Sequence, residues 1–304
     1  MSILIASGGS HPALAQSLAA ELGHALFPIA IARFPDGEMR AKVEGDARGA
    51  DVFVVQPTHA PVGERALELL LVSDALRRAG ASDVTAVVPY LGLSRQERCL
   101  DPATSLGARV LADMLSTAGF RQIISIDLHA PALEGFFGMP VLHVSALGQL
   151  AVSLRQHLVA NSVVVAPDLG AAKIAQRLGA MLGLRVALVR KIRRTAWDVE
   201  DIELLGDVSG CVPVIVDDMI STGGTIAAAL ETLRAHGAHD GATVAATHGL
   251  FTEETATRLL KGGARRIIVT DTVPQPWSPS MPIDVVSVAP VLVEAIRRIG
   301  RQSR

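Results

Sequence analysis

The sequence has 304 residues, enough for two domains of ordinary size. It is 49% hydrophobic but only 3% aromatic, so the core must be built mainly from aliphatic side chains. The formal net charge of −2 argues against nucleic acid or a membrane surface as the main partner.

The apolar segments and the start of the chain argue against two further classes. Every apolar run breaks at Gly, Pro or a charged residue before the roughly 18 residues that a membrane span needs. The first residues, MSILIASGGSHP, lack the basic segment and the long apolar core of a signal peptide. Cys99 and Cys211 suit neither a disulfide framework nor a metal site. We therefore expect a cytoplasmic protein without a membrane span.

Short aliphatic runs alternate with helical patterns from one end of the chain to the other. Runs that are apolar on both faces suit parallel strands covered by helices. The pattern predicts a doubly wound α/β fold, in which ligands bind at the carboxyl ends of the strands. The expected strands are Ile3–Ala6, Val52–Val55, Val84–Val88, Ile123–Ile126, Val163–Ala166, Val186–Val189, Val212–Val216, Thr243–Ala246, Ile267–Thr270 and Asp284–Ser287. The expected helices include Pro12–Leu22, Glu64–Ala79, Ala171–Leu182, Thr225–His236 and Pro290–Ile299.

The two halves of the chain resemble each other. Three pairs of segments align: 51–71 with 212–230, 74–89 with 231–249, and 111–129 with 256–273. Although α/β units in general look alike, we expect two copies of one domain, residues 1–144 and 145–288. The C-terminal helix, residues 289–304, can pack on the first copy. Gln56-Pro57 falls where the second copy has Asp217-Asp218, which favours one ligand loop of this kind per chain.

Two polar segments stand out in the first half of the chain. RFPDGEMR offers an aromatic ring, Phe34, beside Asp36 and Glu38. By itself, a surface turn is the simpler interpretation. VVPYLGLSRQER ends a strand with a polar cluster that includes Arg95 and Gln96. Such a cluster suits contacts to a polyphosphate or a base, although a surface turn would look the same.

Two further strand ends carry candidate metal ligands. SIDLHAPALEGFF puts Asp127 and His129 at the end of a strand. Because alternate residues of a strand point to the same face, this carboxylate and imidazole can converge on one cation. The alternative is a capped strand end with a hydrogen-bonded histidine. VVVAPDLGAAK ends another strand with Asp168 and opens a helix with Gly170.

The segment LVRKIRRT carries three basic side chains after a predicted strand. They are Lys191, Arg193 and Arg194. Without further context, a run of charge of this kind is most often a solvated loop.

VPVIVDDMISTGGTIAAAL joins a run of β-branched residues to an Ala-rich helix through a short loop. Backbone N–H groups at a helix N-terminus bind anions, and the helix dipole favours negative charge there. Gly223 and Gly224 let the backbone approach a ligand closely, and Ser221, Thr222 and Thr225 can add hydroxyl donors. The loop therefore predicts a phosphate site.

Asp217 and Asp218 stand directly before that loop. Because like charges repel, this pair cannot bind the phosphate, but it can accept hydrogen bonds from neighbouring hydroxyls. A sugar phosphate satisfies both demands, with its phosphate on the loop and its ribose hydroxyls on the carboxylates. The alternative is an Asp N-cap followed by a Gly turn, for which one Asp would suffice.

Taken in order, these segments resemble the ribose-phosphate pyrophosphokinase family over nearly the full length. The resemblance rests on the two-copy organisation and on RFPDGE, ALRRAGA, PYLGLSRQER, DLHAPALEGFF, APDLG, the DDM loop and SVAPVLVEAIRRI. The Asp-Asp loop alone also resembles that of type I phosphoribosyltransferases, which have one such domain. The resemblance implies two duplicated type I phosphoribosyltransferase-like domains, each a mainly parallel sheet flanked by helices.

The resemblance also implies a reaction and a role for each motif. The family transfers the diphosphoryl group of ATP to the anomeric hydroxyl of ribose 5-phosphate, with Mg²⁺, and self-association is expected. Ribose 5-phosphate would bind to Asp217, Asp218, Ser221, Thr222, Gly223, Gly224 and Thr225. ATP would bind to Arg95 and Gln96, and its adenine to Phe34, Asp36 and Glu38 of a neighbouring subunit. Asp127, His129 and Asp168 would position Mg²⁺, and Lys191 and Arg193 would neutralise charge at the transferred phosphorus.

The chain departs from the family pattern at a few places. Ser221 replaces an acid of the ribose-phosphate loop, and the basic segment reads K-I-R. The sequence stops soon after its last predicted helix, which leads us to expect little dependence on free phosphate. Two other functions stay open at this point. One is a non-catalytic regulatory homologue of the synthetase, and the other is a phosphoribosyltransferase.

Overall fold

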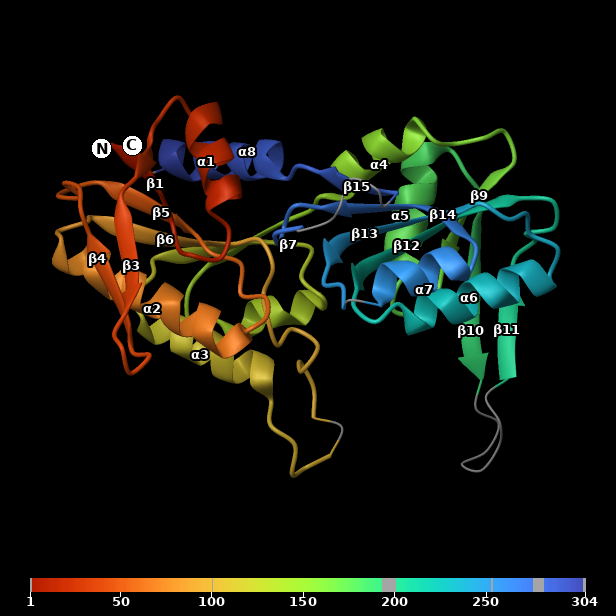
Figure 1. Cartoon of the computed structure of the whole chain (residues 1–304), viewed down its shortest axis with the longest axis horizontal. Coiled ribbons are helices and arrows are strands. Elements are labelled where there is room, and N and C mark those ends of the chain that lie inside the picture. Colours follow the sequence, from red (N-terminus) through yellow and green to blue (C-terminus); the bar gives the residue numbers. More distant parts are fainter. Residues whose placement is uncertain (1, 100, 193–200, 253, 276–281, 303–304) are drawn as a thin grey trace. The chain divides into compact units, whose positions relative to one another are not determined.

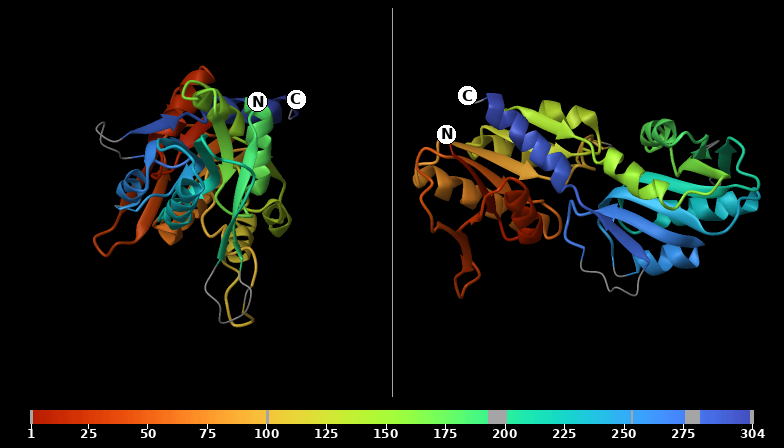
Figure 2. Two further views of the ribbon diagram at one scale, coloured as in Figure 1. Left: turned by 90° about the vertical axis from the view of Figure 1, so that its right-hand side faces the viewer. Right: turned by 90° about the horizontal axis from the view of Figure 1, so that it is seen from above.

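The computed structural model describes residues 2–99, 101–192, 201–252, 254–275 and 282–302. The chain divides into two compact units by its internal contacts. Unit 1 comprises Met1–Ser145, Thr272–Pro274 and Val288–Arg304; unit 2 comprises Ala146–Asp271 and Gln275–Ser287. Each unit has a mainly parallel sheet with helices on both faces (Figures 1 and 2), so the predicted α/β class is confirmed.

Unit 1 is built on a six-stranded parallel sheet with the order β2-β1-β5-β6-β7-β8. Helices α2 and α3 cover one face, where Leu69 and Leu111 join Val54 and Val84 in the core. Helices α1 and α8 pack on each other and cover the other face (Figure 1). The strands are β1 (Ile3–Ser7), β2 (Leu26–Phe27), β5 (Asp51–Val55), β6 (Asp83–Val88), β7 (Gln122–Ile126) and β8 (Val141–Val144). The helices are α1 (Pro12–Glu21), α2 (Val62–Arg78), α3 (Gly107–Thr117), the 3₁₀ helix η1 (Pro131–Phe136) and α8 (Ala289–Gln302).

A separate antiparallel hairpin belongs to unit 1. It consists of β3 (Ile29–Arg33) and β4 (Met39–Val43), and β4 packs against α2. The hairpin stands out from the parallel sheet of its unit (Figure 2). RFPDGEMR therefore forms the tip of a hairpin, which places its side chains away from the core of unit 1.

Unit 2 is built on a seven-stranded sheet with the order β11-β10-β9-β12-β13-β14-β15, in which the pair β10–β11 is antiparallel. On one face, Leu150 of α4 and Leu178 of α5 share a core with Val164 and Val214. Helices α6 and α7 cover the other face. The strands are β9 (Ser162–Ala166), β10 (Val186–Ile192), β11 (Asp201–Leu205), β12 (Val212–Ile220), β13 (Ala242–Gly249), β14 (Ala264–Thr270) and β15 (Ile283–Val286). The helices are α4 (Leu147–Arg155), α5 (Ala172–Leu182), α6 (Gly224–Ala235) and α7 (Thr255–Lys261).

The two sheets repeat one topology. The order β1-β5-β6-β7-β8 of unit 1 corresponds to β9-β12-β13-β14-β15 of unit 2, and all these neighbours are parallel. Helices α1, α2 and α3 follow their strands as α5, α6 and α7 do. Helix α8 packs on α1 as α4 packs on α5, although α8 comes from the end of the chain. The repeated topology supports the predicted duplication and makes β5 the counterpart of β12.

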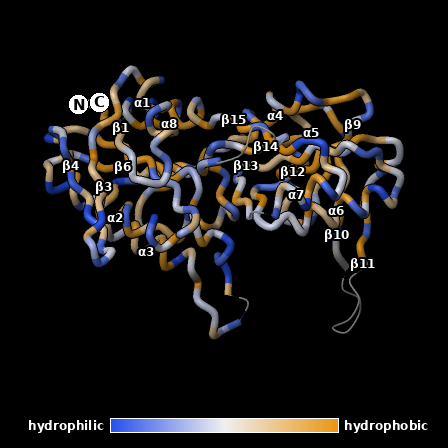
Figure 3. The backbone as a smooth tube through the Cα atoms, viewed as in Figure 1, coloured by the Kyte–Doolittle hydropathy of each residue, from blue (hydrophilic) through white to orange (hydrophobic). Residues whose placement is uncertain are grey.

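The strands that the sequence predicts and those that it misses differ in their place in the sheet. All ten predicted strands are present, and all of them except the edge strand β15 lie in the interior of the two sheets, where the chain is mostly hydrophobic (Figure 3). Among the described residues, the structure has five more, β2, β3, β4, β8 and β11. Each of these lies at a sheet edge or in the hairpin. Such strands are half exposed, so they lack the continuous apolar run by which buried parallel strands are recognised.

The contact between α2 and the sheet of unit 1 gives a test of this core. Leu69 is completely buried, whereas Leu67 on the same helix is 47% exposed. We expect Leu69→Ala to lower the free energy of unfolding by about 2–5 kcal/mol, because it leaves a cavity. Leu67→Ala should change it by less than about 0.5 kcal/mol. Urea unfolding followed by circular dichroism measures both, and equal effects of the two substitutions would contradict the assigned packing.

Candidate functional site

The carboxyl end of β12 carries the two adjacent carboxylates. The strand continues to Ile220, because Asp217 pairs with Ala246 and Ile220 with Gly249 of β13. The prediction that the strand ends before the acidic pair is therefore wrong, and both carboxylates belong to β12. Each is partly buried, and the N–H of Asp218 donates to an Asp217 carboxylate oxygen at 2.8 Å.

Negative charge accumulates around Asp217. Burial, followed by the neighbouring carboxyls of Asp218 and Asp168, raises the pKa of Asp217 to about 8. The hydrogen bond from the Asp218 backbone acts in the opposite direction but is outweighed. The carboxyl is therefore largely protonated at neutral pH in the unliganded protein. Hydroxyl donors or a cation beside it would favour its ionised form.

The start of α6 follows this pair. Gly223 is the N-cap residue, with a φ of 73° in the left-handed region that favours glycine. As a glycine it offers the helix no capping side chain, and the first helical bond is donated by Ala227 to the Gly223 carbonyl at 2.9 Å. The N–H groups of Gly224, Thr225 and Ile226 therefore have no helical acceptor. The structure brings the predicted phosphate residues together at an uncapped helix start, which is a favourable anion site.

Helix α7 packs directly against this loop. The Thr255 hydroxyl donates to the carbonyl oxygen of Ser221 at 2.6 Å, and Arg258 Nη1 donates to the carbonyl oxygen of Thr222 at 2.9 Å. A Cβ atom at Gly223 would lie 3.1 Å from Leu259, so a side chain there would crowd α7 as well as require a positive φ. No sequence motif points to Thr255 or Arg258, because they reach the loop from another helix.

Asp168 lies at the same edge of the sheet of unit 2. It follows β9, which is the neighbour of β12. Its Oδ1 accepts a hydrogen bond from the N–H of Ala171 at 3.1 Å, just before α5 begins. Because its charge raises the pKa of Asp217, the two carboxyls are close enough to interact. The structure therefore brings together three of the predicted site carboxylates.

Lys191 lies within a strand of unit 2. The sequence predicts that this strand ends earlier and that Lys191 belongs to the following loop, which is wrong. Strand β10 continues because it pairs with β11, which places Lys191 opposite Ile202. An ion pair between Arg190 Nη2 and Glu203 Oε2 at 2.6 Å joins the two strands. Arg193, the other predicted cation, lies outside the described residues.

The predicted metal ligands of unit 1 lie in the turn after β7. The strand ends at Ile126, and Asp127 has a φ of 37°, which is uncommon for a residue other than glycine. The expectation that Asp127 and His129 alternate along a strand is therefore wrong. His129 is exposed and Asp127 is partly buried.

A hydrogen bond to His143 of the adjacent strand β8 holds this turn, and the sequence does not predict it. The N–H of Leu128 donates to Nε2 of His143 at 3.0 Å. Nε2 must therefore be unprotonated, so Nδ1 carries the proton and donates to Oε1 of Glu134 at 3.0 Å. The strand β8 and the helix η1 thus support the turn that carries the two candidate ligands.

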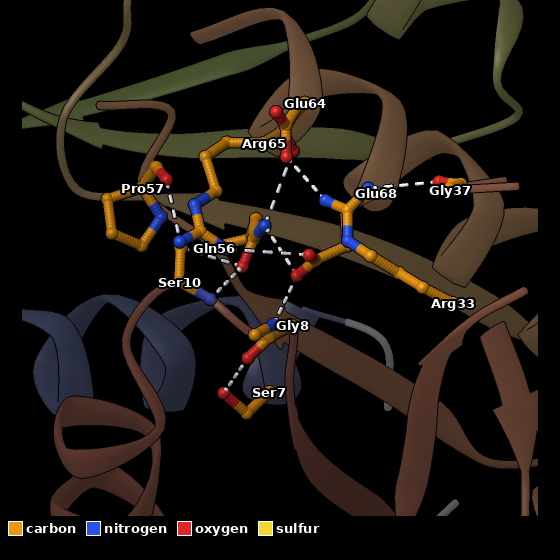
Figure 4. Close-up of polar contacts among 11 residues, drawn as sticks. Ser7, Gly8, Ser10, Arg33, Gly37, Gln56, Pro57, Glu64, Arg65 and Glu68 are labelled. Atoms are coloured by element: carbon orange, nitrogen blue, oxygen red, sulfur yellow. Dashed lines mark hydrogen bonds and ion pairs between the residues drawn. The ribbon is translucent and has the colours of Figure 1, made fainter. Parts of the chain in front are cut away.

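The hairpin tip presents the predicted adenine contacts. Phe34 is 45% exposed, and the Arg40 guanidinium lies 5.4 Å from the centre of its ring. Oδ1 of Asp36 accepts the N–H of Glu38 at 3.1 Å, which stabilises the turn. Arg33 at the base of the tip reaches Glu64 of α2 (Figure 4). The ring is therefore held on an anchored turn with part of its surface accessible.

The predicted triphosphate contacts lie in the turn after β6. Arg95 and Gln96 are both exposed. The N–H of Gln96 donates to the carbonyl oxygen of Leu93 at 2.8 Å. The Gln96 carbonyl in turn accepts the N–H of Ala108 at 3.3 Å, in the first turn of α3. The backbone of this segment is thus attached to a helix, while both residues stay exposed.

The first copy of the loop is closed by internal hydrogen bonds. Gln56, which is completely buried, accepts the N–H of Ser10 at 3.0 Å and the Ser10 hydroxyl at 2.7 Å (Figure 4). Its Nε2 donates to Oε1 of Glu68 at 2.8 Å, and this carboxylate also accepts the N–H of Gly9. The side chains of Gln56, Glu68 and Ser10 are therefore partnered within the protein. This closure supports the expectation of one phosphate loop per chain.

The predicted metal ligands are divided between the units, with Asp127 and His129 in unit 1 and Asp168 in unit 2. Within the part of the chain that the structure describes, no three His, Cys, Asp or Glu side chains are grouped so that they could hold a metal ion. Over the same residues, no helix combines the length and apolar character needed to cross a membrane.

Comparisons with known proteins agree with one another. Residues 3–119 match the N-terminal domain of ribose phosphate pyrophosphokinase, and residues 192–303 match the phosphoribosyl synthetase-associated domain. The ribose-phosphate pyrophosphokinase of Aquifex aeolicus is 37% identical over 298 residues, which cover 98% of this chain and 96% of that protein. The Shewanella oneidensis protein of the same name is 38% identical over 306 residues, covering 99% and 96%. The crystal structure of phosphoribosylpyrophosphate synthetase from Mycobacterium smegmatis has 35% identity and a TM-score of 0.92, covering 99% of this chain and 100% of that chain.

The raised pKa of Asp217 makes a prediction about stability. Its unfolded pKa is near 3.8, so folding favours its protonated form, and its contribution to stability falls as the pH rises from about 4 to about 8. Asp217→Asn removes this effect. We expect the substitution to stabilise the unliganded protein by at least about 1 kcal/mol at pH 8, and by less at pH 5.

Scanning calorimetry without ligands measures this difference. Asp240→Asn is the matched control, because that side chain is 80% exposed in the same unit. It should change the free energy of unfolding by less than about 0.5 kcal/mol at either pH. A gain for Asp217→Asn that does not grow between pH 5 and pH 8 would contradict the assigned environment.

Proposed function

The chain belongs to the ribose-phosphate pyrophosphokinase family, and on that premise we propose that it transfers the diphosphoryl group of ATP to the C1 hydroxyl of ribose 5-phosphate. The products are phosphoribosyl pyrophosphate and AMP. Relatives of that name match the chain over almost its whole length. In the structure, the observation that best supports the reaction is the uncapped start of α6 beside Asp217 and Asp218.

The loop of unit 2 would bind ribose 5-phosphate. Its 5-phosphate accepts hydrogen bonds from the amides at the start of α6, with the hydroxyls of Ser221, Thr222 and Thr225 as further donors. The ribose hydroxyls donate to Asp217 and Asp218. These donors stabilise the ionised carboxylates and so offset the burial that raises the pKa of Asp217. Substrate binding and the charge state of the site are therefore coupled.

Unit 1 would bind ATP through its two exposed segments. The accessible ring of Phe34 suits stacking on adenine, and Arg40 on the ring supports it. Asp36 and Glu38 offer acceptors for the exocyclic amino group. We propose that Phe34, Asp36 and Glu38 of one subunit contact the adenine of an ATP bound in the site of a neighbouring subunit. The enzyme would then act as a dimer or larger assembly. Arg95 and Gln96, both exposed, would contact the triphosphate.

Positively charged side chains would provide most of the stabilisation of the transition state. Phosphoryl-type transfer depends on positioning and on neutralising charge rather than on covalent intermediates. Lys191 and Arg193 are the proposed side chains for charge that develops at the transferred phosphorus. β-strand pairing up to Lys191 gives the backbone of that residue a defined position. Such preorganised charge is worth most where water is excluded.

We propose Mg²⁺ as the cofactor, with Asp127, His129 and Asp168 as its ligands. Mg²⁺ prefers oxygen ligands, and two of these three side chains are carboxylates. The accumulation of carboxyls that raises the pKa of Asp217 also fits a site that receives a cation. When bound, Mg²⁺ would neutralise polyphosphate charge. No specific observation favours a regulatory homologue or a phosphoribosyltransferase, and we propose a cytoplasmic location.

The reaction can be tested directly with the purified protein. Incubation with Mg²⁺, ATP and ribose 5-phosphate should form AMP and phosphoribosyl pyrophosphate in equal amounts, measured by ³¹P NMR. Lys191→Ala should lower kcat on the order of 10³-fold. Lys261→Ala is the matched control, because this exposed lysine ends α7 in the same unit, and it should leave kcat unchanged. Absence of AMP from the wild-type reaction would reject the proposed function.

The shared-subunit proposal predicts complementation. If Phe34 acts in the site of a neighbour, mixed dimers of Phe34→Ala and Lys191→Ala chains contain one intact site of two. Random mixing would then restore about a quarter of the wild-type activity to two inactive preparations, because about half of the dimers are mixed. Activity is measured after the two variants are unfolded and refolded together. If Phe34 acts within its own chain, every mixed site carries a defect and activity stays absent.

A further inference from the structure

Thr255 of α7 has a fully determined set of hydrogen bonds. Its side chain is completely buried. Its hydroxyl lies 2.6 Å from the carbonyl oxygen of Ser221, which can only accept, so Thr255 must donate this bond. It accepts the N–H of Thr252 at 3.0 Å. Since its one proton is committed, the Thr252 hydroxyl must donate the remaining contact at 2.8 Å. The position of the Ser221 carbonyl therefore depends on a buried side chain of another helix.

Arg258, one turn further along α7, holds the next peptide. Its Nη1 donates to the carbonyl oxygen of Thr222 at 2.9 Å. Its Nη2 lies 3.4 Å from Oε2 of Glu254, which keeps the guanidinium over the helix. Two successive carbonyl groups of the loop thus point toward α7.

The direction of these carbonyls fixes the direction of two amides. In a trans peptide the C=O and N–H groups point in opposite directions. The Ser221 carbonyl shares its peptide with the Thr222 N–H, and the Thr222 carbonyl shares its peptide with the Gly223 N–H. Both N–H groups therefore point away from α7, and no hydrogen bond among the described residues uses either of them. They join the amides at the start of α6 in one group of donors.

The corresponding helix start in unit 1 lacks one of these amide donors. At the start of α2, the counterpart of α6, the N-cap residue is Pro61. Proline has no N–H, so this position cannot supply the donor that Gly223 supplies in unit 2. In the same copy the loop is closed by Gln56 and Glu68. The copy without a free ligand loop thus also lacks the amide that α7 directs in the other.

We propose that Thr255 and Arg258 are positioning residues, which turn the Thr222 and Gly223 amides toward the 5-phosphate of ribose 5-phosphate. This inference rests on the proposed function of the loop. Neither side chain needs to touch the substrate. Each acts through a backbone carbonyl, so its removal lets the peptide rotate and weakens the phosphate contact while ribose and ATP contacts remain.

The test compares Thr255→Val with two matched controls. Valine keeps the shape but removes the donor, Thr255→Ser keeps the donor, and Thr257→Val makes the same change at an exposed site on α7. Calorimetric titration of the full-length protein with ribose 5-phosphate should show binding about tenfold weaker for Thr255→Val. Both controls should bind as the wild type does. The KM for ribose 5-phosphate should rise while the KM for ATP and kcat stay unchanged, because the lost contact is one of binding.

A second variant separates geometry from charge. Arg258→Met removes both the donor and the positive charge. A role through general charge would disappear at about 1 M salt, where screening acts within about 3 Å. Positioning predicts that the ratio of variant to wild-type dissociation constants is the same at low and high salt. A ratio that falls to one in high salt would overturn the role of Arg258.

The loop itself provides the control for the underlying function. Gly223→Val should abolish ribose 5-phosphate binding, since the added side chain meets Leu259 and Thr255 and requires a positive φ. If wild-type protein does not bind ribose 5-phosphate, or if Gly223→Val binds it normally, the proposed site is wrong. If Gly223→Val loses binding but folded Thr255→Val retains wild-type affinity, only the positioning inference is wrong. Should Thr255→Val not fold, hydrogen exchange of the Gly223 amide is measured in Arg258→Met at saturating ribose 5-phosphate. Loss of the protection that the ligand gives this amide in the wild type supports the inference, and unchanged protection overturns it.

Discussion

Burial of Asp217 beside two other carboxyls is the constraint on which the rest of unit 2 depends. The parallel pairing of β9 and β12 brings Asp168 to the same sheet edge as Asp217 and Asp218. The raised pKa of Asp217 shows that this arrangement opposes ionisation in the unliganded protein. Aliphatic side chains on both faces of the sheet must offset it. A ligand that brings hydroxyl donors or positive charge stabilises the ionised form of Asp217. The arrangement that is unfavourable in the free protein therefore favours ligand binding.

One topology has produced two different strand ends. In unit 1 the carboxamide of Gln56 and the carboxylate of Glu68 accept the amides of Ser10 and Gly9, so that the chain binds to itself here. In unit 2 the corresponding strand leaves carboxylates and amides whose demands an external sugar phosphate can meet. The exposed side chains on the turns of unit 1, such as Phe34 and Arg95, lie on segments that the parallel sheet does not require for its own packing. The first copy can therefore contribute other contacts, while its own loop stabilises the fold.

The sequence predicts what depends on local pattern and fails where distant segments decide. Buried strands were predicted because their apolar runs are continuous, but edge strands such as β8 and β11 become strands only through a neighbour. For the same reason β10 and β12 extend past their apolar residues, which changes the setting of Lys191 and Asp217. The left-handed Asp127 has no sequence signature, and its turn depends on His143 from the adjacent strand. The site residues had motifs, whereas the residues that hold them did not.

The contacts from α7 also bear on the departure at Ser221. The resemblance to the family leads us to expect an acid there, and serine instead removes a side chain that could contact the sugar. Thr255, however, binds the carbonyl oxygen of Ser221, a group that every residue has. The direction of the Thr222 amide therefore does not depend on which side chain occupies position 221. Because the donors to phosphate are backbone groups and their orientation is set from α7, the loop can exchange its own side chains and still present the same group of amides to an anion.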